Sequence, residues 1–191
     1  MKRTVILIIL LALSGMSLIG CGGSDSSYKY DGVEMLQNGS AELEGIWTPK
    51  DPTGTEYSKA TDVKASGMYS LEINNTNTEN IYGCNWSQTI TDIPVGKQLK
   101  LTAKIKTNDI TGAGVSIVIR CDDTTICDNV HAEMFATTQG KVSIVGTRDW
   151  TPYQVELTDK ITPNIKSITV YLVVLSGSGG TVWFDDISLI H

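Results

Sequence analysis

Apolar and polar residues alternate along several short stretches of this chain, as they do in half-buried β-strands. The clearest example is residues 98–107, where leucine, alanine and isoleucine alternate with lysine and threonine. Residues 81–91 alternate in a similar way, with Cys84 and Trp86 on the more apolar side. The proline and glycine at residues 94–96 predict a turn between the two stretches, and hence a hairpin with one buried and one polar face.

Short apolar runs separated by turn residues continue to the end of the chain. No stretch after the first twenty residues has the 3.6-residue period of an amphipathic helix. The pattern therefore predicts an all-β protein, built as an antiparallel β-sandwich. The expected strands are residues 33–37, 45–48, 58–63, 69–74, 81–91, 98–107, 114–121, 142–146, 152–157, 167–175 and 181–190.

The N-terminal twenty residues differ from the rest of the chain. Lys2 and Arg3 precede an apolar stretch, residues 4–13, which is too short to span a membrane as a helix. Residues 18–21, Leu-Ile-Gly-Cys, resemble the lipobox of bacterial lipoproteins, in which cleavage leaves the cysteine as the new N-terminus carrying lipid. The resemblance implies a signal peptide at residues 1–20, a lipidated Cys21 with a flexible tether over residues 21–31, and a domain at residues 32–191. The alternatives are an ordinary secretory signal and an uncleaved anchor.

A lipid on Cys21 would hold the protein on a bacterial membrane through buried acyl chains. The aspartate of the tether, Asp25, does not directly follow Cys21, where it would resemble a signal for retention in the inner membrane. We therefore expect the protein in the bacterial cell envelope, at the outer membrane or the cell surface.

The chain has 191 residues and a formal net charge of −6 at pH 7. This length suits one domain with a sizeable core after removal of the signal. Its lysines are dispersed among acidic residues, whereas nucleic-acid binding needs clustered basic residues, so nucleic acid is excluded as a partner. We expect a monomer.

Three cysteines remain in the predicted domain. Cys121 and Cys127 bracket a short polar loop and are expected to pair as a disulfide in an oxidising compartment. Cys84 lies on the apolar side of its strand and is expected to be a buried thiol. A zinc site formed by these cysteines and His131 is an alternative that no Cys-x-x-Cys spacing supports.

The residues that alternate away from the core would form a polar surface if their strands share one sheet. Its members would be Asn85, Ser87, Lys104, Lys106, Ser116, Arg120, Thr169 and Tyr171. Such a surface is rich in hydrogen-bond donors, and Tyr171 gives it an aromatic ring. Of the tryptophans, Trp86, Trp150 and Trp183 are expected to pack inside the protein, and the place of Trp47 is open.

Five segments, in order, resemble parts of the jelly-roll carbohydrate-binding modules of families four, nine and twenty-two. They are LQNGSAE (residues 36–42), SGMYSLEI (66–73), IYGCNWSQTITDIPVGKQLKLTAKIKT (81–107), RDWTPYQVEL (148–157) and TVWFDDISLI (181–190). The resemblance covers about residues 33–190 and implies a galactose-binding-domain-like jelly roll. Two departures are Ala41, where such modules have phenylalanine, and the strand with Lys104 and Lys106, which often carries an aromatic residue.

The resemblance implies a non-catalytic site for a polysaccharide or oligosaccharide. Tyr82 stands where the modules often carry a stacking aromatic ring, and it joins Tyr171 as a candidate platform for a sugar. The expected polar partners are Asn85, Ser87, Lys104, Lys106 and Arg120. The outward-facing cations among them favour an acidic polysaccharide. The alternative function is a protein-binding or structural role in the envelope with the same fold.

Glu42 and Asp185 resemble positions that hold a structural calcium ion between the first and last strands of such modules. We expect one Ca²⁺ there and no other cofactor. The domain's histidines, His131 and His191, have no Ser-His-Asp context, and acids such as Glu133 and Asp149 have no recognisable partner. The sequence therefore predicts a binding protein and not an enzyme.

Overall fold

The computed structural model describes residues 29–50, 53–79, 81–124 and 132–191. In these residues, ten β-strands form two five-stranded sheets, and all neighbouring strands are antiparallel. The first sheet, called the β4 sheet below, has the order β1-β4-β9-β6-β7. Its strands are β1 (Thr48–Lys50), β4 (Cys84–Ile90), β9 (Ser167–Val174), β6 (Val115–Asp122) and β7 (Met134–Thr137).

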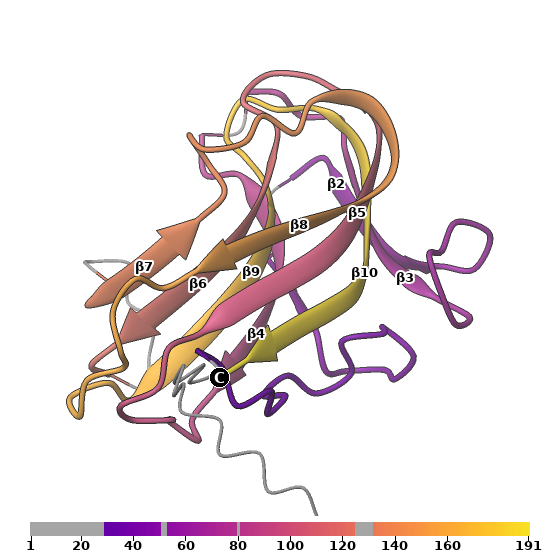
Figure 1. The fold of residues 1–191 in the computed structure, drawn as a ribbon. Coiled ribbons are helices and arrows are strands. Elements are labelled where there is room, and N and C mark those ends of the chain that lie inside the picture. The colour runs from indigo at the N-terminus through magenta and orange to yellow at the C-terminus, as the bar shows by residue number, and fades with distance from the viewer. Residues whose placement is uncertain (1–28, 51–52, 80, 125–131) are drawn as a thin grey trace, which may run out of the picture.

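The second sheet, called the β5 sheet below, has the order β2-β3-β10-β5-β8. Its strands are β2 (Thr55–Ala60), β3 (Ser70–Asn75), β10 (Gly180–Ile190), β5 (Lys100–Ile110) and β8 (Gly146–Glu156). Figure 1 shows the ribbon of β8, β5 and β10 crossing over that of β6, β9 and β4. The prediction of an all-β antiparallel sandwich is confirmed.

Several predicted strand boundaries differ from the structure. Residues 146–156 form one strand, β8, where two were expected, and β7 arises in a stretch that was expected to be a loop. Residues 33–37 contribute only the isolated bridge between Glu34 and Ile190. Among the described residues, no helix is long and apolar enough to cross a membrane.

The predicted hairpin of residues 81–107 is wrong, because β4 and β5 belong to opposite sheets. The predicted turn is present, with the Lys97 N–H bonded to the carbonyl of Pro94 at 3.1 Å, but it does not pair β4 with β5. In addition, the Gly96 N–H donates to the carbonyl of Ile161 at 2.8 Å, and the N–H of Ile161 donates to the carbonyl of Lys97 at 2.8 Å. The segment is thereby tied to a distant loop while the chain crosses between sheets. Both strands still bury an apolar face, since those faces meet across the sandwich.

The inner faces of the two sheets form one hydrophobic core. Trp86 is buried in it, as predicted, and its indole N–H donates to the carbonyl of Glu72 in the opposite sheet at 3.0 Å. Trp47 is also buried, with its indole N–H bonded to the carbonyl of Asn38 at 3.0 Å. This bond places Trp47 against the turn that contains the fully buried Ala41, where more core volume was needed.

Trp150 and Trp183 do not pack into the core, so that prediction is wrong. Neither belongs to the core cluster or to the partly buried residues packed against it. The pleat of β10 explains the position of Trp183, because its neighbours Val182 and Phe184 both point inward and are fully buried. Both indoles therefore lie on the outer side of the β5 sheet.

Two acidic side chains accept hydrogen bonds from the backbone of the loop before β3. Asp185, which is fully buried, accepts hydrogen bonds from the backbone N–H groups of Ala65 and Ser66 at 2.8 and 2.9 Å. Glu42 accepts from the N–H groups of Met68 and Tyr69 at 2.8 and 3.3 Å. The loop is thus fixed to the last strand at one end and to the N-terminal segment at the other.

Gly67, in the middle of this loop, allows a test of how tightly Glu42 holds the loop. It has a positive φ of 56°, and a Cβ atom there would lie 2.2 Å from Glu42 Oε1. Gly67→Ala must adopt the left-handed backbone region and push the carboxylate away, so we expect a loss of roughly 2–4 kcal/mol in the free energy of unfolding. Urea denaturation measures the change.

The matched control is Gly32→Ala. Gly32 also has a positive φ, 77°, but nothing lies within 4 Å of its Cβ position. We expect this variant to lose only the free energy that a non-glycine residue needs to adopt a positive φ, about 1 kcal/mol. Equal losses for the two variants would contradict a loop held tightly by Glu42.

Candidate functional site

The outer face of the β4 sheet brings together most of the predicted site residues. Its central row crosses the sheet at one register, from Ser87 on β4 through Tyr171 on β9 to Val118 on β6. Side chains of directly opposed residues lie on the same face of a sheet. Thr48 on β1 and Thr137 on β7 end this row.

Two further rows flank the central one. One row carries Asn85, Val173 and Ser116 on β4, β9 and β6. The other crosses four strands, and its members are Thr89, Thr169, Arg120 and Phe135. The face is therefore mostly hydroxyl groups and small apolar side chains around one central ring, that of Tyr171. Thr48 and Thr89 are exposed, and Ser87 and Thr137 are partly exposed, whereas Ser116 and Thr169 are buried.

Three aromatic side chains are placed to contact a ligand. Tyr171 is partly buried in the middle of the face, and Tyr82 lies just before β4 with 84% of its surface exposed. Phe135 on β7 is 55% exposed beside Arg120, and sequence reasoning missed it. The only signal is the alternation in residues 134–137, which is too short to separate a strand from a loop.

Hydroxyl groups on this face bond to one another. Thr89 Oγ1 and Thr169 Oγ1 lie 3.0 Å apart, and Ser116 Oγ lies 2.8 Å from Thr137 Oγ1. Asn85 differs from them, because its side-chain oxygen is buried and has no hydrogen-bond partner among the described residues. A buried carbonyl oxygen without a donor is costly, and an internal water molecule would satisfy it.

A groove of about 750 Å³ runs along the β4 side of this face. It opens because β1 pairs only with residues 85–87 of β4 and leaves the rest of that strand edge uncovered. Its walls include Thr48, Ser87 and Thr89 from the face, with Met35 and Ile46 from the N-terminal segment. The groove extends the face beyond the sheet and offers hydroxyl and apolar contacts, with the amides of Gln37 and Gln88 and the carboxylate of Asp92 also in its lining.

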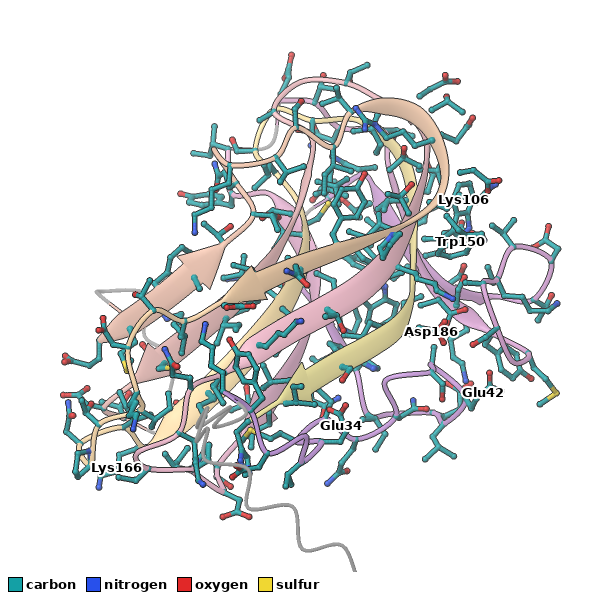
Figure 2. All side chains as sticks on the ribbon, viewed as in Figure 1. Glu34, Glu42, Lys106, Trp150, Lys166 and Asp186 are labelled. Carbon is teal, nitrogen blue, oxygen red and sulfur yellow. The ribbon has the colours of Figure 1, made fainter. Side chains whose placement is uncertain are left out.

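Lys104 and Lys106 are not part of this face, although they were predicted to be. They lie on β5, in the opposite sheet, and each forms an ion pair there. Lys104 Nζ lies 2.8 Å from Asp186 Oδ2, and Lys106 Nζ lies 2.7 Å from Asp149 Oδ1. Figure 2 labels Lys106 and Asp186 on this side of the molecule.

Arg120 does lie on the candidate face, but its charge is matched locally. Its guanidinium bonds the Asp122 carboxylate, with Nε 3.0 Å from both oxygens and a terminal nitrogen 2.8 Å from Oδ1. Both side chains are largely buried. The three cations that favoured an acidic polysaccharide are thus divided between two faces, and each has a carboxylate partner.

The predicted calcium ligands are engaged by other donors. Both oxygens of Asp185 accept backbone N–H groups, that of Asp186 at 2.7 Å among them, and Glu42 Oε1 accepts two. No group of three or more acidic, histidine or cysteine side chains in the described parts of the chain could hold a metal ion. The carboxylates of Glu42 and Asp185 are therefore not open to a calcium ion in this arrangement. The calcium site stays a prediction.

Cys84 and Cys121 are fully buried, as expected for Cys84. Burial, with a contribution from the Asp122 charge, raises the pKa of the Cys121 thiol to about 12, so this thiol is protonated at neutral pH. Its predicted disulfide partner, Cys127, lies outside the described residues, as do His131 and Cys21. The disulfide, the alternative zinc site and the lipidation therefore stay predictions.

Comparison with solved structures places this fold among jelly-roll domains. A xylan-binding CBM22 domain of Xyn10C from Paenibacillus barcinonensis matches 83% of this chain over 94% of its own length, with a TM-score of 0.57 and 14% identity. A Stig cyclase from Fischerella sp. TAU matches 84% of this chain over 98% of its own, with a TM-score of 0.60 and 12% identity.

The enzymatically active domain of tailspike protein 4 from bacteriophage CBA120 also matches, with a TM-score of 0.60 and 16% identity. The match covers 83% of this chain but only 21% of the tailspike chain. No protein-family model and no curated protein matches the sequence. At these identities the likeness shows the fold alone, and it confirms the predicted resemblance to carbohydrate-binding modules at that level.

The Lys104–Asp186 pair gives a prediction for the pH dependence of stability. Burial raises the pKa of Asp186, but hydrogen bonds from Lys104 and Ser66 outweigh it and hold the pKa below its ordinary value of 3.8. A lowered carboxyl pKa stabilises the folded state above pH 3.8, and that contribution disappears as the pH falls through the folded-state value. Lys104→Met should therefore lower the urea midpoint at pH 7 and change it less and less below pH 4.

The control for this variant is Lys141→Met, at an exposed position outside the strands. Lys141 has no ion pair among the described residues, so its replacement should change the midpoint by a similar amount at both pH values. A deficit for Lys104→Met that persists undiminished at pH 2 would contradict the ion-pair explanation.

Proposed function

We propose that this protein binds a neutral polysaccharide on the outer face of its β4 sheet, without catalysis. The observation that carries the proposal is the composition of that face, a central tyrosine ring surrounded by hydroxyl groups with no unmatched charge from Arg120. Sugar rings stack their C–H faces on aromatic side chains, and their hydroxyl groups bond to uncharged polar groups. An uncharged polar group and an aromatic ring are present side by side in one row, as Ser87 and Tyr171.

Two features of the face support an extended ligand. The groove beside β4 continues the face past Ser87 and Thr89. Tyr171 and Phe135 are separated by two strand spacings and by two residues along the strand, or roughly 12 Å. A chain of several sugar rings could contact both aromatic side chains, and a single sugar could not.

The comparisons add limited support. A xylan-binding domain and a cyclase have similar folds, so the fold alone permits both binding and catalysis. The choice between them rests on the site. Cys121 is buried in the core between the sheets and is not part of the face, and the Asp122 carboxylate is occupied by Arg120. Hydroxyl groups and rings then remain as the functional groups of the face.

We also propose that the protein is a lipoprotein of the bacterial envelope, displayed at the outer membrane or cell surface. The basis is the sequence of residues 1–21, with its short apolar stretch and lipobox-like ending. A domain that holds polysaccharide near the membrane would need such an anchor and a short tether. Incorporation of labelled fatty acid into the wild-type chain, but not into Cys21→Ala, tests this part by itself.

The binding proposal is tested with Tyr171→Ala. We expect the wild-type domain to bind at least one neutral glycan in a panel of xylohexaose, cellohexaose and laminarihexaose, measured by calorimetry. Removal of the ring should lower the affinity at least roughly tenfold, equivalent to about 1.4 kcal/mol. Oligogalacturonate, which is acidic, should bind more weakly than the neutral glycans.

The control is Leu43→Ala, which removes an exposed apolar side chain outside the candidate face. It should bind glycans as the wild type does, and thermal melting should show that both variants remain folded. Unchanged binding by Tyr171→Ala, or a preference for oligogalacturonate, would contradict the proposed site.

A further inference from the structure

The outer face of the β5 sheet carries a second cluster of aromatic and charged side chains. Trp183 on β10 lies directly opposite Glu72 on β3 and directly opposite Lys106 on β5. The register between β5 and β8 shifts between Ile105 and Thr107, which sets Asp149 and Trp150 together opposite Lys106. One row across four strands thus contains two indoles, two carboxylates and an ammonium group.

Hydrogen bonds hold this row in place. The Trp183 indole N–H donates to Glu72 Oε2 at 2.7 Å, which fixes the orientation of the ring. Asp149 Oδ1 accepts from Lys106 Nζ at 2.7 Å and from the backbone N–H of Trp150 at 2.9 Å. Figure 2 shows Lys106 and Trp150 next to each other at the edge of the ribbon. The row is organised before any ligand arrives, which lowers the cost of binding.

The two indole rings stand outside the hydrophobic core. Neither belongs to the core cluster or to the residues packed against it, and each is partly exposed. Among the described residues, the aromatic pair is Tyr57 with Trp86, and the cation–π contacts involve Tyr30 and Tyr69. The core and these ring contacts therefore do not account for Trp150 and Trp183.

We propose that this row is a second carbohydrate-binding surface, on the opposite side of the sandwich from the Tyr171 face. Indole rings spaced by two strands, about 10 Å, would stack on sugar rings of one chain. Glu72 and the Lys106–Asp149 pair would bond the sugar hydroxyl groups that extend from the ring edges. The two carboxylates, Glu72 and Asp149, outnumber the one ammonium of Lys106, so the row suits a neutral hydroxyl-rich ligand better than a polyanion.

Two opposed surfaces would give the domain a function that one surface cannot. Each domain could hold two glycan chains, or two segments of one chain, and so cross-link polysaccharide at the envelope. Binding of a polymer would then be strengthened by effective concentration without new contacts. The inference shares only its ligand class with the proposed function, since the two surfaces have no residue in common.

The indole N–H signals in an NMR spectrum test the second surface directly. The chain has four tryptophans, and the buried Trp47, whose indole N–H is bonded to Asn38, serves as the internal control. Trp86 is no control, because its indole N–H is bonded to the carbonyl of Glu72 in the row. The probes are xylohexaose, cellohexaose and laminarihexaose, and Trp150→Phe and Trp183→Phe assign the two outer signals. We expect at least one glycan to shift the Trp150 and Trp183 signals while the Trp47 signal stays in place.

The same titration in Tyr171→Ala separates the two surfaces. The outer indole signals should still shift, and the additional change Trp183→Ala should remove the binding that remains, with at least a tenfold loss of affinity. If no glycan in the panel shifts the two signals, the second surface is wrong, whatever the Tyr171 face binds. If the shifts disappear in Tyr171→Ala, the row does not bind independently, and the proposal is likewise overturned.

Discussion

The burial of one face of every long strand against the other sheet is the constraint on which this structure depends. Val182 and Phe184 of β10, and Leu101 and Ile105 of β5, are essentially fully buried. Because the side chains of a strand alternate, burying these residues forces Trp183 and Lys106 outward. The polar character of both outer faces is thus a direct consequence of the core.

The same constraint decides which residues can act together. Side chains of two strands can share one outer face only if both strands belong to the same sheet. Ser87 and Tyr171 meet that condition, whereas Lys104 and Lys106 do not. The division gives each sheet its own chemistry, with hydroxyl groups around a tyrosine on one side and indoles with paired charges on the other. A single polar surface, expected from alternation alone, becomes two separate ones.

Local pattern predicted much of this fold, because alternation and turn residues are local properties. It placed β3, β4, β5, β6, β9 and β10 within a few residues and assigned Trp86 to the core. It failed where the outcome depends on contacts distant in sequence. The connection after β4 resembles a hairpin turn, but its Gly96 N–H is bonded to Ile161 in another loop. The prediction that Trp150 packs in the core failed for a similar reason. The apolar surface of an indole does not reveal which side of a pleated strand it occupies.

The candidate site could be predicted only in part. Asn85, Ser87, Arg120 and Tyr171 were found from alternation within their own strands, and the structure places them on one face. Phe135 was missed because its strand has four residues, and the Asp122 partner of Arg120 was missed because no pattern marks an ion pair. Those two omissions matter, since one adds an aromatic contact and the other removes a free charge.

The central claim is that a neutral glycan binds across the outer face of the β4 sheet. Backbone amide shifts of the soluble chain from residue 22 onward, which retains all ten described strands, test it most directly during titration with the glycan that binds best. The account predicts shifts that cluster around Ser87, Tyr171 and Val118. Binding with shifts confined to other parts of the domain, or no binding to any neutral glycan, would contradict it.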